Sequence, residues 1–143
     1  MDLEVALRGS KEYLQSIGLT DRCEFVVGDF LDSVSARGDC FLLSRVIHDW
    51  DDEQAVQILT DCRHAMQSGH KLLIIERVLA PDSSDPEGAL TDLSMMVVNG
   101  GRERTLAEFQ MLLSASGFAF TNLVPTKSLV QVVEGIAVPP GDA

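Results

Sequence analysis

Residues 40–51 read CFLLSRVIHDWD, and this stretch decides the fold class. The apolar run 40–43 is typical of a buried strand, and His48, Asp49 and Trp50 follow soon after it. In an open α/β sheet, ligands bind in the crevice outside the carboxyl ends of the strands. His48 therefore lies where catalytic chemistry is expected, and it is the first candidate for a catalytic residue.

Helical and strand patterns alternate on both sides of this stretch. The sequence predicts strands over 23–27, 40–46 and 71–75, and helices over 7–17, from Asp51 to a stop at Gly69, over 90–98, and from Thr105 to a stop at Gly117. Two β-rich segments, 118–124 and 129–136, are joined by four residues, which favours an antiparallel hairpin. The pattern predicts an α/β protein with a sheet covered on both faces.

Composition restricts the possible partners. The chain has 143 residues, enough for one domain, and a formal net charge of −11 that repels phosphate backbones and anionic lipid. We therefore expect no nucleic-acid or membrane partner. The three cysteines lie in apolar segments and are expected to be core residues in a reducing compartment. With no signal peptide or apolar run of membrane-spanning length, a cytoplasmic protein is expected.

Four stretches together resemble one family: VGDF (27–30), VIHDWDDE (46–53), LIIE (73–76) and GGRERT (100–105). They are similar to stretches of the small-molecule O-methyltransferases that use S-adenosylmethionine, such as caffeate, flavonoid and acetylserotonin O-methyltransferases, in the same order and at similar intervals. The resemblance implies that residues 1–138 form the C-terminal part of an O-methyltransferase catalytic domain. Residues 139–143 are expected to be a disordered tail.

The resemblance also implies roles for individual residues. His48 matches the general base, and Glu76 and Glu103 match the carboxylates that orient its imidazole. Contacts to the cofactor S-adenosylmethionine fall on Asp2 (ribose), Asp29 and Phe30 (adenine), Trp50 beside the adenine, and Ser44, which stands where the family commonly has Lys. Met95 and Asn99 match positions that line the acceptor pocket.

The chemistry of methyl transfer explains these residue types. A hydroxyl becomes a good nucleophile when its proton leaves, and a histidine with a pKa near ~6.5 accepts that proton at neutral pH. A neighbouring carboxylate fixes the imidazole tautomer and stabilises the imidazolium that forms. Because the sulfonium is the electrophile, the reaction needs neither a metal nor a covalent nucleophile, only in-line placement of acceptor and methyl group.

The sequence also departs from the family pattern. It lacks the glycine-rich turn that follows the first strand in the family and precedes the position of Asp2, and it lacks the N-terminal helical region through which the family dimerises. The resemblance therefore implies an incomplete Rossmann-like sheet without its first strands, with a C-terminal antiparallel hairpin. In the family order 3-2-1-4-5-7-6, strand 23–27 would lie roughly 14 Å from strand 40–46, unless the two collapse together. A homodimer is expected for the full-length form.

Several residues have structural explanations as well. A single histidine after a strand is often only a loop residue, Trp50 and Met95 are equally typical of packing, and the acidic residues 51–53 suit the first turn of a helix. Two functions remain open. One is methyl transfer to a hydroxyl of a small, aromatic acceptor within a longer or complemented protein. The other is a non-catalytic remnant that acts as a protein-interaction or self-association module.

Overall fold

The computed structural model describes residues 1–82 and 84–139. It consists of two compact units, Met1–Arg37 and Gly38–Ala143. The expected disordered tail lies outside the described residues except for Pro139. Among the described residues, no helix is long and apolar enough to cross a membrane.

The first unit is built on helix α1 (Glu4–Ser16), which a short turn of 3-10 helix, η1 (Thr20–Arg22), follows. Gly18 ends α1 with a left-handed backbone (φ 70°), as its position after the helical pattern predicted. The predicted strand 23–27 was wrong. Within residues 1–82 and 84–139 this segment makes one parallel bridge, between Val27 and Asp2, because the chain beside it turns into α1 at Glu4.

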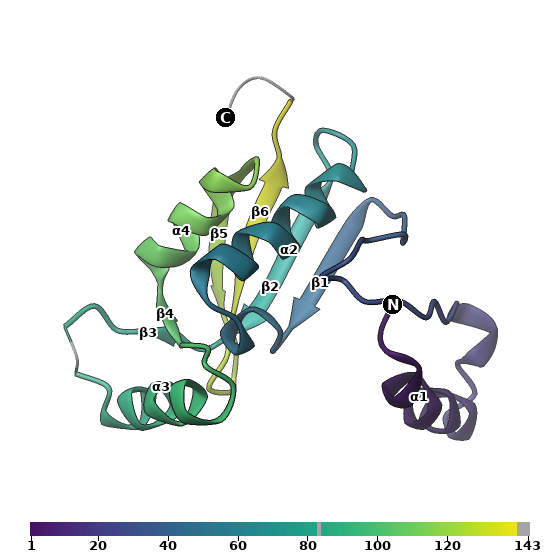
Figure 1. Ribbon diagram of the computed structural model, residues 1–143, viewed down its shortest axis with the longest axis horizontal. Helices are drawn as coiled ribbons and strands as arrows, with labels where there is room; N and C mark the ends of the chain where they lie inside the picture. The colour runs from purple at the N-terminus through teal and green to yellow at the C-terminus, as the bar shows by residue number, and fades with distance from the viewer. Residues whose placement is uncertain (83, 140–143) are drawn as a thin grey trace. The chain divides into compact units, whose positions relative to one another are not determined.

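The second unit contains a four-stranded sheet in the order β1-β2-β6-β5 (Figure 1). Its strands are β1 (Cys40–Ser44), β2 (Lys71–Glu76), β5 (Phe118–Pro125) and β6 (Gln131–Ala137). β1 and β2 are parallel, and the other two pairings are antiparallel. The predicted hairpin is confirmed, and the strand order agrees with the last four positions of the expected order, 4-5-7-6.

Helices α2 (Asp52–His64) and α4 (Leu106–Ala115) pack on one face of this sheet (Figure 1). The core between these helices and the sheet is formed by fully or almost fully buried side chains, among them Ile58, Leu59, Leu72, Ile74, Phe109, Leu113 and Val133. Within the described part of residues 38–139, no helix covers the other face, where Leu42 is 58% exposed. The predicted covering of both faces is therefore not found within the described part of this unit, and the side chains of β2 alternate between buried and less buried.

Several element boundaries differ from the predicted ones. Helix α3 (Pro86–Val98) begins before the predicted residue 90 because the Asp85 side chain caps it by accepting a hydrogen bond from Gly88 N. Strand β1 stops at Ser44 because Arg45 has a left-handed backbone (φ 53°). A parallel pair of two-residue strands, β3 (Val78–Leu79) and β4 (Arg104–Thr105), was not predicted.

The cysteine expectation is only partly correct. Cys62 is buried, and burial raises the pKa of its thiol to about 12. Cys23 and Cys40 are exposed, contrary to the expectation that all three are core residues. Cys40 alternates with the inward-facing Phe41 along β1, so its side chain lies on the uncovered face of the sheet.

Candidate active site

The loop after β1 places His48 at the carboxyl edge of the sheet. The chain leaves β1 through Arg45 and enters a single 3-10 turn, η2 (Ile47–Asp49). Glu76, the last residue of the neighbouring parallel strand β2, accepts hydrogen bonds at Oε1 from Val46 N (2.8 Å) and Ile47 N (3.0 Å). Because β1 and β2 end side by side, one carboxylate satisfies two backbone donors of the loop and fixes its conformation.

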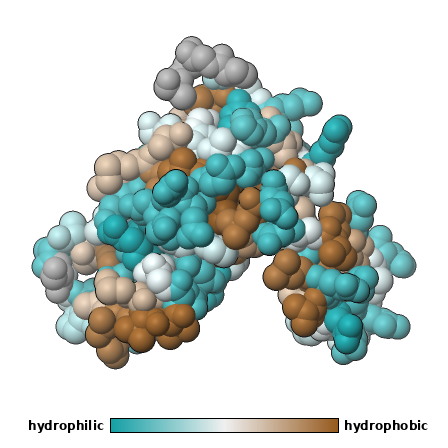
Figure 2. All heavy atoms as spheres, viewed as in Figure 1, coloured by the Kyte–Doolittle hydropathy of each residue, from teal (hydrophilic) through white to brown (hydrophobic). Residues whose placement is uncertain are grey.

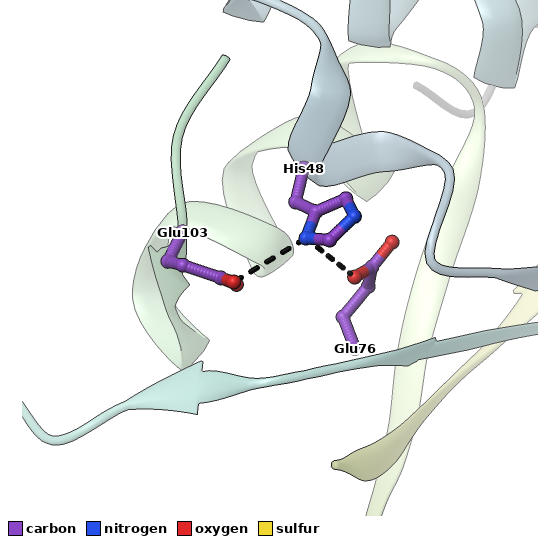
Figure 3. A group of neighbouring side chains, drawn as sticks. All are labelled: His48, Glu76 and Glu103. Carbon is purple, nitrogen blue, oxygen red and sulfur yellow. Dashed lines mark hydrogen bonds and ion pairs between the residues drawn. The ribbon is translucent and has the colours of Figure 1, made fainter. Parts of the chain in front are cut away.

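His48, Glu76 and Glu103 meet in a buried cluster (Figure 3). His48 Nδ1 lies 3.3 Å from Glu103 Oε1 and 3.6 Å from Glu76 Oε2. The residues are only 5%, 0% and 3% exposed, in chain order. Glu103 precedes β4, and its backbone N donates to Asp92 Oδ1 on α3 (2.8 Å). The three residues assigned to catalysis are therefore brought together from three separate segments.

The cluster determines how the imidazole carries its protons. A proton on Nδ1 donates to Glu103 Oε1 and faces Glu76 Oε2, which leaves the lone pair on Nε2 when the ring is neutral. Asp49 Oδ1 lies 3.6 Å from Nε2. The hydrogen bond to Glu103 and the negative charges of Glu76, Glu103 and Asp49 raise the pKa of His48 above 6.5, although burial opposes this. Burial raises the pKa of Glu76 above 4.5.

Arg104 binds backbone carbonyl groups of the His48 loop, and the sequence analysis did not identify it as a site residue. Its guanidinium is completely buried and donates from Nη1 to Ile47 O (2.9 Å) and from Nη2 to Trp50 O (2.9 Å). Nε and Nη2 also donate to Asp52 Oδ1 at 3.0 and 2.8 Å. An arginine among charged residues reads as a surface residue, and the sequence signal that could have found it is its place within GGRERT.

Gly101 allows the segment before Glu103 to approach the loop. A Cβ atom built on Gly101 would lie 2.0 Å from His48 O and 2.5 Å from Asp49 C. The next residue, Arg102, donates its backbone N to His48 O at 2.9 Å. The glycine therefore permits a close backbone contact that ties the His48 loop to the segment carrying Glu103.

Gly101→Ala is expected to lower the free energy of unfolding by about 1–3 kcal/mol, because the added methyl group meets backbone atoms that cannot rotate away. Urea unfolding followed by Trp50 fluorescence measures this directly. Gly38→Ala is the matched control, since its Cβ would meet Cys40 O at an ordinary 3.5 Å. Equal effects of the two substitutions would contradict the close approach.

Helix α3 ends beside the His48 loop and carries the predicted acceptor-pocket residues. The Asn99 side chain donates a hydrogen bond to Asp49 Oδ1, and Met95 lies half-buried one turn earlier. Large apolar side chains of α3 are exposed and form a hydrophobic surface (Figure 2): Leu90, Leu93, Met96, Val97 and Val98. An apolar surface that ends at the imidazole loop suits the binding of an apolar molecule.

The residues assigned to the cofactor divide between the two units. Asp2, Asp29 and Phe30 belong to the first unit, where Asp2 O accepts from Gly28 N (3.1 Å) and so lies beside the segment that leads to Asp29. The Asp29 carboxylate accepts from Leu31 N at 2.9 Å. Two carboxylates thus stand at the ends of two neighbouring parallel segments.

Ser44 and Trp50 belong to the second unit. Ser44 is exposed at the end of β1, and Trp50 is half-buried just after η2. The backbone O of Trp50 accepts a hydrogen bond from Arg104. The guanidinium that fixes the His48 loop therefore also fixes the backbone of Trp50.

Comparisons with known proteins agree on one family. Residues 1–119 match the model of the O-methyltransferase domain. The chain is 47% identical over 122 residues to the phenazine O-methyltransferase PhzM of Lysobacter antibioticus, with 85% of this chain and 36% of the relative covered. It is 34% identical over 124 residues to phenazine-1-carboxylate N-methyltransferase of Pseudomonas aeruginosa, with 87% and 37% covered.

A solved structure shares the fold. The O-methyltransferase NcsB1 from neocarzinostatin biosynthesis, in complex with S-adenosylmethionine and 2-hydroxy-5-methyl naphthoic acid, superposes with a TM-score of 0.84 at 37% identity. The match covers 95% of this chain and 40% of that one. The chain therefore spans well under half the length of these relatives.

Proposed function

Because the chain belongs to the O-methyltransferase domain family, we propose that it transfers the methyl group of S-adenosylmethionine to a hydroxyl of a small aromatic molecule, within a longer or complemented protein. The observation that carries this proposal is the buried imidazole of His48, whose Nδ1 lies 3.3 Å from Glu103 Oε1 and 3.6 Å from Glu76 Oε2. We take residues 1–138 as the C-terminal part of the catalytic domain.

His48 acts as the general base in this proposal. The acceptor hydroxyl donates its proton to Nε2, and the imidazolium that forms is stabilised by the carboxylates of Glu76 and Glu103 at Nδ1. Because Glu76 also holds the loop backbone, the ring stays in place during the transfer. Bound S-adenosylmethionine supplies the electrophilic methyl group.

A hydroxyl acceptor fits this arrangement better than a ring nitrogen does. An aromatic nitrogen with a free lone pair attacks a methyl group without losing a proton, whereas a hydroxyl gains nucleophilicity when a base removes its proton. A buried histidine between two carboxylates is the arrangement that a hydroxyl requires. The apolar side chains of α3 beside the loop support an aromatic acceptor.

Several residues of this chain have side chains suited to binding the adenosine part of S-adenosylmethionine. Carboxylates such as Asp2 and Asp29 accept hydrogen bonds from ribose hydroxyls and from an adenine amino group, and an aromatic side chain such as Trp50 packs against a base. We propose Asp2, Asp29, Phe30, Ser44 and Trp50 as cofactor contacts. We propose that the methionine end of the cofactor is held outside these 143 residues, by the glycine-rich turn that the family resemblance places before Asp2.

Calorimetric titration with S-adenosylmethionine, of this chain and of the longer or complemented protein, tests the proposal. The complete protein is expected to bind the cofactor and to methylate a hydroxyl-bearing aromatic. Binding by the 143-residue chain itself would mean that its own residues hold the adenosine without the glycine-rich turn. A complete protein that neither binds nor transfers would contradict the proposal.

A non-catalytic remnant remains the second candidate. The observation that favours it is the apolar surface that the second unit exposes, on α3 and around Leu42 of the sheet. Exposed apolar surface of this kind is typical of interaction sites. Sedimentation of the chain at several concentrations, together with a methylation assay of the longer or complemented protein, separates the candidates, because a remnant would associate and its complemented form would still show no turnover.

Glu76→Gln is expected to shift the pH dependence of His48. Removing one negative charge near Nδ1 lowers the raised pKa of His48, so the rise of methyl transfer with pH moves to lower pH. Glu53→Gln, an exposed substitution with the same change in charge, should leave the profile in place. Titration of the His48 imidazole protons by NMR, in the presence of a chelator, measures the shift.

The same raised pKa of His48 affects stability. Its folded value lies above 6.5, so the charged ring contributes stability that is complete below about pH 6.5 and is lost as pH rises through the folded pKa. Glu76→Gln should reduce this loss of stability, and urea unfolding at several pH values would detect it. An unchanged pH dependence of stability would contradict the electrostatic role of Glu76.

A further inference from the structure

We propose that His48, Glu76 and Glu103 bind a divalent transition-metal ion such as Zn²⁺, through Nδ1 and one oxygen of each carboxylate, and that the bound ion prevents His48 from acting as a base. This inference goes beyond the proposed methyl transfer, which needs no metal. It makes the candidate active site a site of metal inhibition.

The spacing of the ligand atoms supports the proposal (Figure 3). One ligand atom from each of the three residues lies within 4.8 Å of the other two. Nδ1 lies 3.3 Å from Glu103 Oε1 and 3.6 Å from Glu76 Oε2. Tetrahedral coordination with bonds of about 2.1 Å keeps ligand atoms roughly 3.4 Å apart. Small movements would therefore suffice to surround an ion.

Two buried carboxylate oxygens that accept no hydrogen bond give a second indication. Oε2 of Glu76 and Oε2 of Glu103 are buried and accept no hydrogen bond from any residue that the structure describes. The residues are 0% and 3% exposed, and buried acceptors without partners are costly. In the described part of the chain, neither carboxylate forms an ion pair with Lys or Arg, so His48 is the one cationic partner. A bound cation would satisfy this excess of negative charge.

The donor set selects the kind of ion. Mg²⁺ and Ca²⁺ prefer oxygen ligands, whereas Zn²⁺ and Co²⁺ also bind imidazole nitrogen strongly. One imidazole and two carboxylates supply three ligands and leave a fourth position for water, as in many zinc sites with open coordination. The cluster therefore suits Zn²⁺ better than Mg²⁺.

Metal binding and base catalysis exclude one another at this ring. The ion needs the lone pair of Nδ1, so the proton of a neutral ring must move from Nδ1 to Nε2, and an imidazolium must release one proton to solvent. Nε2 then carries hydrogen and cannot accept the proton of a hydroxyl. Inhibition would follow from this change of tautomer, without movement of the loop.

The test uses the 143-residue chain with Cys23→Ser and Cys40→Ser, because the two exposed thiols would also bind zinc. Co²⁺ is added to metal-free protein while the visible absorption is recorded, and Zn²⁺ is then used to displace it. We expect one equivalent to bind. Glu103→Gln should weaken binding by about tenfold or more, and Glu53→Gln, exposed on α2, should leave it unchanged.

NMR of the unsubstituted chain provides a readout that does not depend on the folding of a variant. Paramagnetic Co²⁺ should broaden or shift the His48 imidazole protons before those of His64 and His70. Absence of binding, equal affinity of Glu103→Gln and Glu53→Gln, or effects confined to His64 and His70 would overturn the proposal. Neither methyl donor nor acceptor is present, so failure here is distinct from failure of the proposed methyl transfer.

Discussion

Replacement of His48 by glutamine is expected to lower kcat for methyl transfer by about 10²–10⁴-fold, the usual contribution of a general base. Glutamine still donates a hydrogen bond to Glu103 but cannot accept the proton of the acceptor hydroxyl. Affinity for S-adenosylmethionine should remain, because the base contacts the acceptor. The measurement is turnover, together with cofactor titration, in the longer or complemented protein that the proposal requires.

The pH profile separates a base from a structural residue. Removal of the base should remove the rise in kcat with pH that follows the raised pKa of His48. His64→Gln is the matched control, because His64 is exposed near the end of α2 and should leave both kcat and the profile unchanged. Parallel loss of turnover and cofactor binding in His48→Gln would count against His48 as the base.

Replacement of Arg104 by methionine is expected to lower the free energy of unfolding by about 3 kcal/mol or more, since hydrogen bonds to a charged group contribute about 1.5–3 kcal/mol each. Methionine fills much of the volume but leaves Ile47 O and Trp50 O without their donor. Urea unfolding gives the magnitude. Fluorescence of Trp50, the one tryptophan of the sequence, reports on the same loop.

Two further variants show whether the geometry or the charge of the Arg104 side chain is responsible for its effect on stability. Arg104→Lys keeps the charge, but a single ammonium group cannot reproduce the planar fork that reaches both carbonyls and Asp52, so recovery should be partial. Arg102→Met removes a charge that is 42% exposed and should change stability by less than about 1 kcal/mol. Similar effects of Arg104→Met and Arg102→Met would show that Arg104 does not clamp the loop.

Local sequence signals predicted where α2 and α4 begin, although α2 ends at His64, before the predicted stop at Gly69. Asp51 accepts a hydrogen bond from Gln54 N at the start of α2, and Thr105 and Glu108 form the full reciprocal capping box of α4. These signals require only residues within one turn of each other. Strand 23–27 failed for the opposite reason, because a strand depends on a partner, and among the residues that the structure describes only Asp2 pairs with it.

The candidate site was predictable only in part. The resemblance placed His48, Glu76 and Glu103 in register, and the structure brings the three together. The resemblance included Arg104 within GGRERT but assigned no role to Arg104 or to Asp49, which lies beside Nε2. Burial of an arginine depends on distant carbonyl groups that no local pattern encodes. The early start of α3 was missed because the predicted helix began at residue 90, although Pro86 suits the first turn of a helix.

The His48 loop is fastened by residues that come much later in the chain. Glu103 reaches His48 across 55 positions, and Arg104 reaches Ile47 across 57. Contacts at this separation form only after a large loop has closed, which makes them slow to assemble. During synthesis from the N-terminus, β1 and α2 emerge well before their clamp exists. We therefore expect the imidazole to acquire its final geometry late in folding, so that a partly synthesised chain carries the proposed base without the carboxylates that orient it.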